Sequence, residues 1–530
     1  MTTRVTLGMV ATPHRTASDA GMEILRSGGN AFDAAVAAAF ALGVVTPAST
    51  GLAGYGGCLI AWLAGRDEPV AVDFTSRAPA AAHDTMFLAD EDGRGGFSVR
   101  GAANAFGGLA VDIPGVAAGL ALVLRRFGTL PLETVMRPAI ASARQGFPVD
   151  TWTVQKIAET LQPHAERYPE AFRLFSVRGR PPRPGDMMTN PDLARTLEAV
   201  ARNGAREFYQ GELARAIVHA VRADGGILTL EDLASYTPQE TAPLSVSFRG
   251  HTVWTPPLPA GGLTVLQMLR VLEGFTLPHS GDDADLIHLL VEVAKPCWRE
   301  RLTKCGDPEV VIIDSAAELG DGRVETLRGE VSHGLKAPRP GEVIAPDPLL
   351  TGTVHLCTAD HKGNVVSLTT TMGGSFGSLL AVPETGLVLG HGISRFDPRP
   401  QRPNSIGPRK RPMHNMSPML VTRGRRPVLA LGVAGGRTIL STLVYSLARL
   451  IGLGHPPDAA ISTTRFHIET AEPVLIEEGG DALAAELTRR GHVVALRPRF
   501  GSLQGIAVGD TPDAMSGIAD PRRDGAVRWA

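Results

Sequence analysis

The sequence predicts an α+β protein, and three observations carry that prediction. Residues 16–26 have helical periodicity closed by Gly28 and Gly29, and Asn30 is placed to cap a second helix over residues 31–45. Alternation over residues 59–63 and 69–74 predicts a pair of strands. Residues 353–360 and 365–371 predict two more strands, joined by a turn at residues 360–364.

The remaining elements follow the same rules. Residues near 115–145 and 190–235 are predicted to be mainly helical, as are those near 437–452 and 481–490. Residues 419–422 and 428–432 predict further strands. The segment 323–349, rich in proline, glycine and charge, predicts an exposed linker that would tolerate a chain break.

Composition favours a soluble protein that acts on a small molecule. The 530 residues are 43% hydrophobic and 20% charged with a formal net charge of −2, which gives no reason to expect a nucleic-acid or membrane partner. The first residues lack the apolar core of a secretory signal, and residues 31–45 are too short and too interrupted by Asp33 to span a bilayer. We therefore expect a cytoplasmic protein.

The four cysteines predict neither a disulfide framework nor a metal site. Cys58, Cys297, Cys305 and Cys357 show no CxxC pair and no metal-ligand spacing, so no metal or other cofactor is expected. Cys357 shares a strand face with Thr353 and His355. It is either a thiol nucleophile or, as is commoner, a small buried hydrophobe.

Thr353 is the strongest candidate for a catalytic residue. It follows Gly352 and opens a predicted strand. If the Gly352–Thr353 bond were cut, the freed α-amine would lie beside the Thr353 hydroxyl, and the residue would carry its own general base. Threonine is also common in strands, so this pair of residues alone fits an ordinary strand start equally well.

Motifs along nearly the whole chain decide between these readings. They are GMVA at 8–11, GGNAFDAAVA at 28–37, GLAGYGG at 51–57, DFTSRAP at 73–79, NPDLA at 190–194, FYQG at 208–211, GGILTLEDL at 225–233, PPLPAGG at 256–262, RPMHNMSP at 411–418 and GGR at 435–437. In order and spacing they resemble the gamma-glutamyltransferase family of N-terminal nucleophile hydrolases. The resemblance implies a four-layer αββα sandwich formed jointly by a large fragment, residues 1–352, and a small fragment, residues 353–530.

The resemblance also implies a mechanism. Thr353 would first attack the Gly352 carbonyl to release itself, and would then attack a substrate amide to form an acyl-enzyme that water or an amine resolves. Gly435 and Gly436 align with the family's oxyanion-hole glycines. Thr371 matches the threonine that hydrogen-bonds the catalytic amine, although Thr369 and Thr370 beside it leave open that all three are plain strand residues.

The substrate-binding positions depart from the family pattern. Gly373 stands where gamma-glutamyl specialists carry an asparagine, Gly392 and Arg395 where a glutamine and an aspartate hold the substrate ammonium, and His414 and Asn415 where two serines bind its carboxylate. Arg395 would repel an ammonium. A slip of one residue in this alignment would instead give the acidic role to Asp397.

The carboxylate-binding arginine expected within residues 73–75 is also absent. Arg77 is a candidate substitute, because residues two apart share a strand face. A shortened stretch over residues 396–411 predicts an open active-site mouth. Between Arg395 and Arg426 nine Lys or Arg residues face one acid, Asp397, which fits either a positive rim that attracts anionic substrates or a solvated loop.

Three functions follow from these residues. The family default is gamma-glutamyl amides such as glutathione. The altered pocket instead favours dicarboxylic acyl amides of the glutaryl type, as cut by related cephalosporin acylases. A non-catalytic binding protein that kept the fold is the third, and the retained Thr353, Thr371 and Gly435–Gly436 speak against it.

Overall fold

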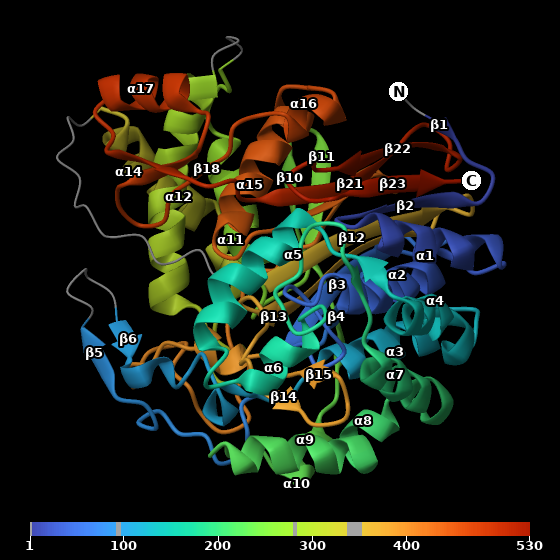
Figure 1. Ribbon diagram of the computed structural model, residues 1–530. Helices are drawn as coiled ribbons and strands as arrows, with labels where there is room; N and C mark the ends of the chain where they lie inside the picture. Colours follow the sequence, from blue (N-terminus) through green and yellow to red (C-terminus); the bar gives the residue numbers. More distant parts are fainter. Residues whose placement is uncertain (1–2, 92–96, 279–282, 337–351) are drawn as a thin grey trace.

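The protein is a sandwich of two facing seven-stranded sheets, covered by helices on both outer sides (Figure 1). The computed structural model describes residues 3–91, 97–278, 283–336 and 352–530. Helices α1 to α4 lie on one side of the sheets, at the lower right of Figure 1, and α11, α12 and α15 lie on the other, at the upper left. The α+β, αββα architecture predicted from the sequence is confirmed.

The first sheet is assembled from both ends and the middle of the chain. In spatial order it contains β1 (Thr3–Arg4), β22 (Ala514–Ala519), β21 (Ser502–Val508), β17 (Arg426–Ala434), β16 (Met419–Arg423), β11 (His251–Thr255) and β10 (Leu244–Phe248). The second contains β23 (Ala526–Trp529), β2 (Gly8–Thr12), β12 (Gly352–Asp360), β13 (Val365–Gly373), β3 (Gly56–Trp62), β4 (Val70–Asp73) and β9 (Gln239–Thr241). All neighbours within the two sheets pair antiparallel.

The sequence predicts most of the principal helices close to their observed bounds, but it predicts neither α11 nor α12. The second sheet is flanked by α1 (Arg15–Arg26), α2 (Ala31–Val45), α3 (Val116–Phe127), α4 (Leu132–Gln145) and α7 (Pro191–Asn203), and the first by α11 (Gly262–Leu272), α12 (Asp283–Lys304), α15 (Thr438–Leu447) and α17 (Asp481–Arg489). Asn30 caps α2, since its Oδ1 accepts from the amides of Phe32 and Asp33 at 2.8 and 3.0 Å. Gly28 follows α1 with φ +90°.

Smaller elements surround this frame. The short helices are α5 (Thr151–Lys156), α6 (Pro169–Leu174), α8 (Arg206–Gln210), α9 (Glu212–Ala223), α10 (Leu230–Ser235), α13 (Ser315–Glu318) and α16 (Pro457–Ile461). The short strands are β5 (Ala89–Glu91), β6 (Phe97–Val99), β7 (Phe147–Pro148), β8 (Met187–Met188), β14 (Ala381–Val382), β15 (Leu387–Val388), β18 (Phe466–His467), β19 (Val474–Glu477) and β20 (Val494–Arg497).

Part of the predicted linker is helical, so the linker prediction is wrong for those residues. Helix α14 (Asp321–Gly334) covers the beginning of the segment 323–349. Val324, Leu327 and Val331 are buried at helical spacing, and this apolar stripe was hidden among many charged residues. Residues 337–351, which include the last part of the predicted linker, lie outside the described part of the chain.

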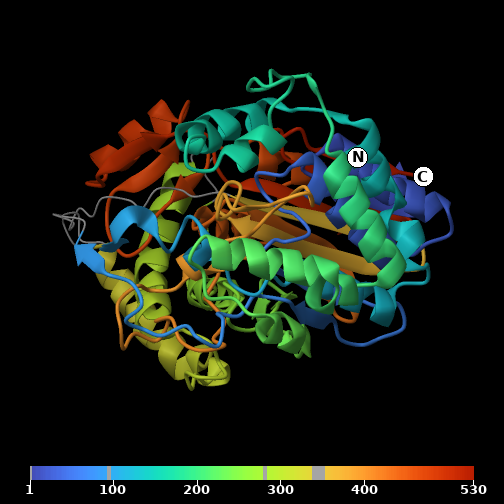
Figure 2. The same cartoon turned by 60° about the horizontal axis from the view of Figure 1, so that its bottom comes forward.

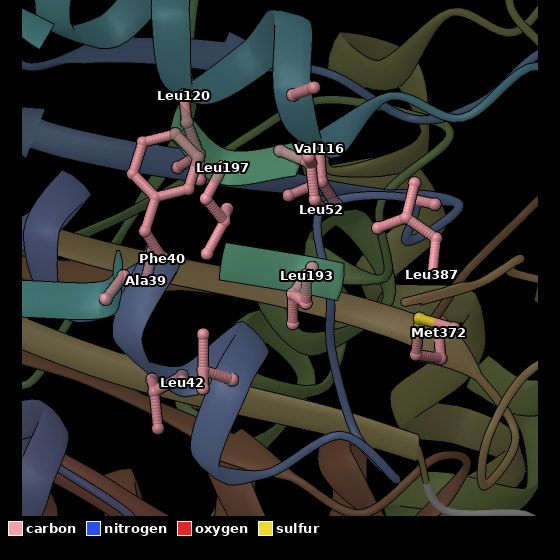
Figure 3. Close-up of a cluster of buried hydrophobic side chains, with 14 of the residues drawn as sticks. Ala39, Phe40, Leu42, Leu52, Val116, Leu120, Leu193, Leu197, Met372 and Leu387 are labelled. Atoms are coloured by element: carbon pink, nitrogen blue, oxygen red, sulfur yellow. The ribbon is translucent and has the colours of Figure 1, made fainter. Parts of the chain in front are cut away.

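The core beneath the second sheet joins helices to the strand that leads into the site. Met372 of β13 points from the sheet toward Leu52, Leu193 and Leu387 (Figure 3). Residues on either side of position 352 thus share one hydrophobic core. Within the described ranges, no helix has the length and apolar character needed to cross a membrane.

Candidate active site

Thr353 is the second residue of β12 and lies opposite Thr371 of β13. Its Oγ1 is 2.9 Å from Oγ1 of Thr371, and the Thr371 hydroxyl donates to the carbonyl oxygen of Gly352 at 2.6 Å. Because a hydroxyl has one hydrogen, the Thr353 hydroxyl is the donor in the threonine pair. The amide of Gly373 also donates to Thr371 Oγ1, at 2.9 Å. Thr371 therefore connects the Thr353 hydroxyl with the Gly352 carbonyl.

The backbone is irregular at the same point. Gly352 pairs with Gly373 and Thr353 with Thr371, so two steps on β13 oppose one step on β12 and Met372 is left between them. A Cβ on Gly352 would overlap the carbonyl group of Gly374 and lie 3.0 Å from its Cα. Only glycine fits at position 352, and the bond after it lies in a bulge rather than in a regular ladder.

The three neighbouring threonines have different surroundings. Thr370 Oγ1 accepts from Thr50 at 2.9 Å on the helix-covered face of the sheet. Thr369 Oγ1 is 2.9 Å from Nδ1 of His355, between the two sheets. Of the three, Thr371 is the one that contacts Thr353, which supports the site role that the resemblance implied for it.

Gly435 and Gly436 form the turn between β17 and α15. Gly436 has φ +61°, which favours glycine. Contacts between the sheets indicate where this turn lies: Ser367 donates to Leu431 O at 3.1 Å, and the missing side chain of Gly432 leaves room for the His355 ring. From this contact, β12 leads back along the chain from His355 to Thr353, and β17 leads forward from Gly432 to Gly435 and Gly436. Thr353 and the glycine pair therefore lie toward the same end of the two facing strands.

Two of the departures from the family pattern are glycines whose side-chain space is filled by a neighbour. Gly373 has φ +99°, and a Cβ there would lie 2.7 Å from Nε2 of His391 and 3.4 Å from Tyr55. Nε2 of His391 accepts from the amide of Gly374, and its Nδ1 donates to Ala105 O at 2.7 Å. Burial lowers the pKa of His391 to about 3, so the ring is neutral.

Gly392 is the second such glycine. A Cβ on it would overlap Oδ2 of Asp112 and lie 2.6 Å from Oγ of Ser76. Ser76 donates to the same Asp112 oxygen. Burial raises the pKa of the fully buried Asp112 to about 8. The sequence singled out Gly392 but missed Asp112 and Ser76, because nothing in one sequence shows that the three segments meet.

The predicted carboxylate-binding positions also meet other protein groups. His414 Nε2 is 2.8 Å from Thr75 Oγ1, so the residues in place of the family's arginine and first serine hydrogen-bond to each other. Burial lowers the pKa of His414 to about 3. Arg301 of α12, another residue that the sequence did not single out, donates to His414 O at 2.7 Å and to Asn415 Oδ1 at 3.1 Å.

The strand-face argument for Arg77 is wrong, because β4 ends at Asp73. The Arg77 guanidinium makes two hydrogen bonds to Glu309, at 2.7 and 2.8 Å, and one to Arg409 O. It is therefore committed to the protein rather than presented to a substrate. Asp397 is likewise paired, with Arg399 at 2.6 and 2.9 Å.

Most of the positive charges on which the positive-rim interpretation depends are paired with acidic side chains. Arg411 is 5% exposed and bonds Asp73 and Asp307, while Arg425 and Arg426 pair with Asp67 and Asp510. Arg395, half-buried, follows Gly392 in the short helix Gly392–Arg395 and donates to Ser394 Oγ at 3.0 Å. The positive charge of Arg395 acts electrostatically on the side chains of Tyr55 and His391.

Cys357 lies away from the nucleophile, one full strand repeat beyond His355. Its Sγ is 3.3 Å from His355 Nε2, and burial raises the pKa of its thiol. All four cysteines are free and buried. Because a thiol that resists ionisation is a poor nucleophile, the small-hydrophobe interpretation of Cys357 holds.

Comparison with known proteins agrees with this geometry. The sequence model of the gamma-glutamyltranspeptidase family matches residues 17–530. The glutathione hydrolase proenzyme of Escherichia coli (strain K12) is 33% identical over 98% of this chain and 91% of its own length. The acylase ACY 1 proenzyme of Pseudomonas sp. (strain SE83) is 35% identical over 98% of this chain and 92% of its own.

Among solved structures, the cephalosporin acylase of Bacillus halodurans superposes with a TM-score of 0.88 and 28% identity, covering 100% of this chain and 97% of that one. Both the named activities and the fold of these relatives are those of acyl-transferring enzymes. The comparisons therefore do not favour the third predicted function, a non-catalytic binding protein. The chain belongs to the gamma-glutamyltranspeptidase family and is an enzyme of that family.

Proposed function

We propose that this enzyme cuts its own chain after Gly352 and then uses Thr353 as an N-terminal nucleophile to hydrolyse or transfer gamma-glutamyl or related acyl groups from amides. The observation that carries the proposal is the hydrogen-bonded series from Thr353 through Thr371 to the Gly352 carbonyl. A second support is that both named proenzyme relatives imply a processed precursor.

The same hydrogen bonds support a route for the proposed self-cleavage. Thr353 Oγ attacks the Gly352 carbonyl carbon, Thr371 donates to the developing oxyanion, and the C–N bond breaks to give an ester on Oγ and a free amine. Water hydrolyses the ester.

In turnover the same hydroxyl attacks the substrate amide. The freed α-amine, with an ordinary pKa of about 7.7–8.0, accepts the proton and returns it to the leaving amine. The backbone amides at Gly435–Gly436 are the proposed oxyanion hole, because no side chain blocks their approach. Water or an amine acceptor then attacks the acyl-enzyme.

Dicarboxylic acyl amides are the second candidate substrate class. Arg395 stands near Tyr55 and His391, where a substrate ammonium would be repelled. Arg301 is 2% exposed and donates to Oδ1 of the adjacent Asn415. Its Nη1 has no hydrogen-bond partner among the described residues. A cation buried in this way favours an anionic group nearby.

The test is to incubate purified enzyme with gamma-glutamyl, glutaryl and acetyl p-nitroanilides and to analyse the small fragment by mass spectrometry. An acyl group trapped on Thr353 is the expected result, and Thr353→Ala should trap nothing and release no p-nitroaniline. Normal turnover by Thr353→Ala would show that the nucleophile is elsewhere.

A further inference from the structure

Asp112 occupies the space from which a side chain at position 392 would extend. A Cβ on Gly392 would overlap Asp112 Oδ2 and lie 2.6 Å from Ser76 Oγ, so no side chain fits there while the Asp112 carboxyl keeps its place. Residues 112 and 392 are therefore coupled: one of them can carry a side chain in this space, but not both. In this chain the space is filled by the side chain of Asp112.

This space adjoins the nucleophile through a short series of contacts. Gly373 donates to Thr371 Oγ1 at 2.9 Å, and Thr371 contacts Thr353. The His391 ring fills the side-chain space of Gly373, and Gly392 is the next residue. We call Asp112 and His391 the wall: they come from segments that precede α3 and follow β15, and they connect to Thr353 through Gly392, Gly373 and Thr371.

The wall carries no full charge near neutral pH. Burial raises the pKa of Asp112 to about 8, and its Oδ1 has no hydrogen-bond partner among the described residues. The titratable groups that feel Asp112 are Tyr55 and Tyr236, both with raised pKa values because of burial. His391 is neutral as well, so an ammonium placed here would meet hydrogen-bonding groups but no anion.

We propose that Asp112, held by Ser76, is a specificity-determining residue of the acyl pocket: it replaces a longer ammonium-binding side chain at position 392 and makes the enzyme prefer acyl groups without an α-ammonium. This inference rests on the proposed function of Thr353. It identifies the substrate class as amides of dicarboxylic or similar acyl groups. Because Asp112 is fully buried, it acts by shape: its carboxyl fills the space that a side chain at position 392 would take.

The experiment measures kcat/KM for glutaryl and gamma-glutamyl p-nitroanilide, which share a leaving group and differ only in the ammonium. The wild-type enzyme should favour the glutaryl donor by about tenfold or more. Asp112→Asn, a neutral side chain of the same shape, should keep this ratio. The double variant Asp112→Gly/Gly392→Gln should shift it toward the gamma-glutamyl donor by about tenfold.

Two single variants and a control make the result interpretable. Gly392→Gln alone should lower turnover of both donors, because its side chain collides with Asp112. Asp232→Asn changes a buried carboxyl that caps α10 and does not take up the side-chain space of Gly392, and it should leave the donor ratio unchanged. If the double variant does not fold, Asp112→Asn still tests whether a charged Asp112 binds the substrate ammonium.

Specific loss of gamma-glutamyl turnover in Asp112→Asn would overturn the inference, since it would show that a charged Asp112 binds an ammonium. So would a wild-type enzyme that favours the gamma-glutamyl donor. If the wild type turned over neither donor and trapped no acyl group on Thr353, the proposed function would fail first, and this inference with it.

Discussion

At the scale of single residues, the site depends on one hydroxyl with all of its hydrogen bonds in use. Thr371 accepts from Thr353 and from Gly373 and donates to Gly352. Removing the Thr371 hydroxyl leaves the Gly352 carbonyl without this donor, while Thr353, the proposed nucleophile, stays in place. The neighbouring Thr370, whose hydroxyl bonds Thr50 on the other face, provides a matched control.

We therefore expect Thr371→Val to slow self-cleavage by roughly 10²-fold, the usual scale for losing one donor to a developing oxyanion. The measurement is the rate at which intact precursor disappears on a denaturing gel. Thr370→Val should cleave at nearly the wild-type rate. Equal slowing in both variants would mean that the effect is a general loss of sheet stability.

The raised pKa of Asp112 makes a prediction about stability. Its folded pKa of about 8 lies above the ordinary value, so the folded state binds the proton more tightly than the unfolded state. The free energy of unfolding should fall as pH rises from about 4 to about 8, by up to roughly 1.4 kcal/mol per pH unit.

Asp112→Asn cannot lose this proton. Its Tm relative to the wild type should therefore rise steadily between about pH 5 and about pH 7.5. Thermal denaturation of both proteins across that range measures the difference. Parallel curves would show that Asp112 is ionised in the folded protein.

At the scale of elements, the proposed oxyanion hole depends on the turn from β17 to α15. Gly436 has φ +61°, where a side chain adds strain and shifts the backbone amides. Gly436→Ala should lower turnover by about 10²-fold. Gly424, with φ +57° in the turn between β16 and β17, is a matched left-handed glycine with open space around it.

Gly424→Ala should have the same kind of backbone strain and keep near-normal turnover. The measurement is steady-state kinetics of both variants after circular dichroism shows that they are folded. Near-normal kcat in folded Gly436→Ala would place the oxyanion hole elsewhere.

At the scale of the whole molecule, many local elements were predictable, but α11 and α12 were not, and neither was the long-range packing. Periodicity located α1, α2, β3, β4, β12 and β13, because each pattern is local. Helix α14 was missed because charge masked a narrow apolar stripe. Of the site, Thr353 and Thr371 could be found from the chain, whereas Asp112 against Gly392 could not, since that contact joins distant segments.

The sheets also predict how the two fragments behave after cleavage. Strands β12 and β13 of the proposed small fragment lie between β2 and β3 of the proposed large one, and β23 pairs with β2. The N- and C-terminal ends of the chain, one in each proposed fragment, lie near each other (Figure 2). Cleaved protein should run as one species in native size-exclusion chromatography and as two bands on a denaturing gel. Separation of the fragments without denaturant would contradict this arrangement.

The most direct test of the whole account is N-terminal sequencing of the purified, active enzyme. Thr353 as the nucleophile requires a small fragment that begins Thr-Val-His-Leu at residue 353. Thr353→Ser should yield the corresponding fragment because a hydroxyl is kept, and Thr353→Ala should stay intact. An enzyme that turns over acyl amides while its Gly352–Thr353 bond remains uncut would contradict the account.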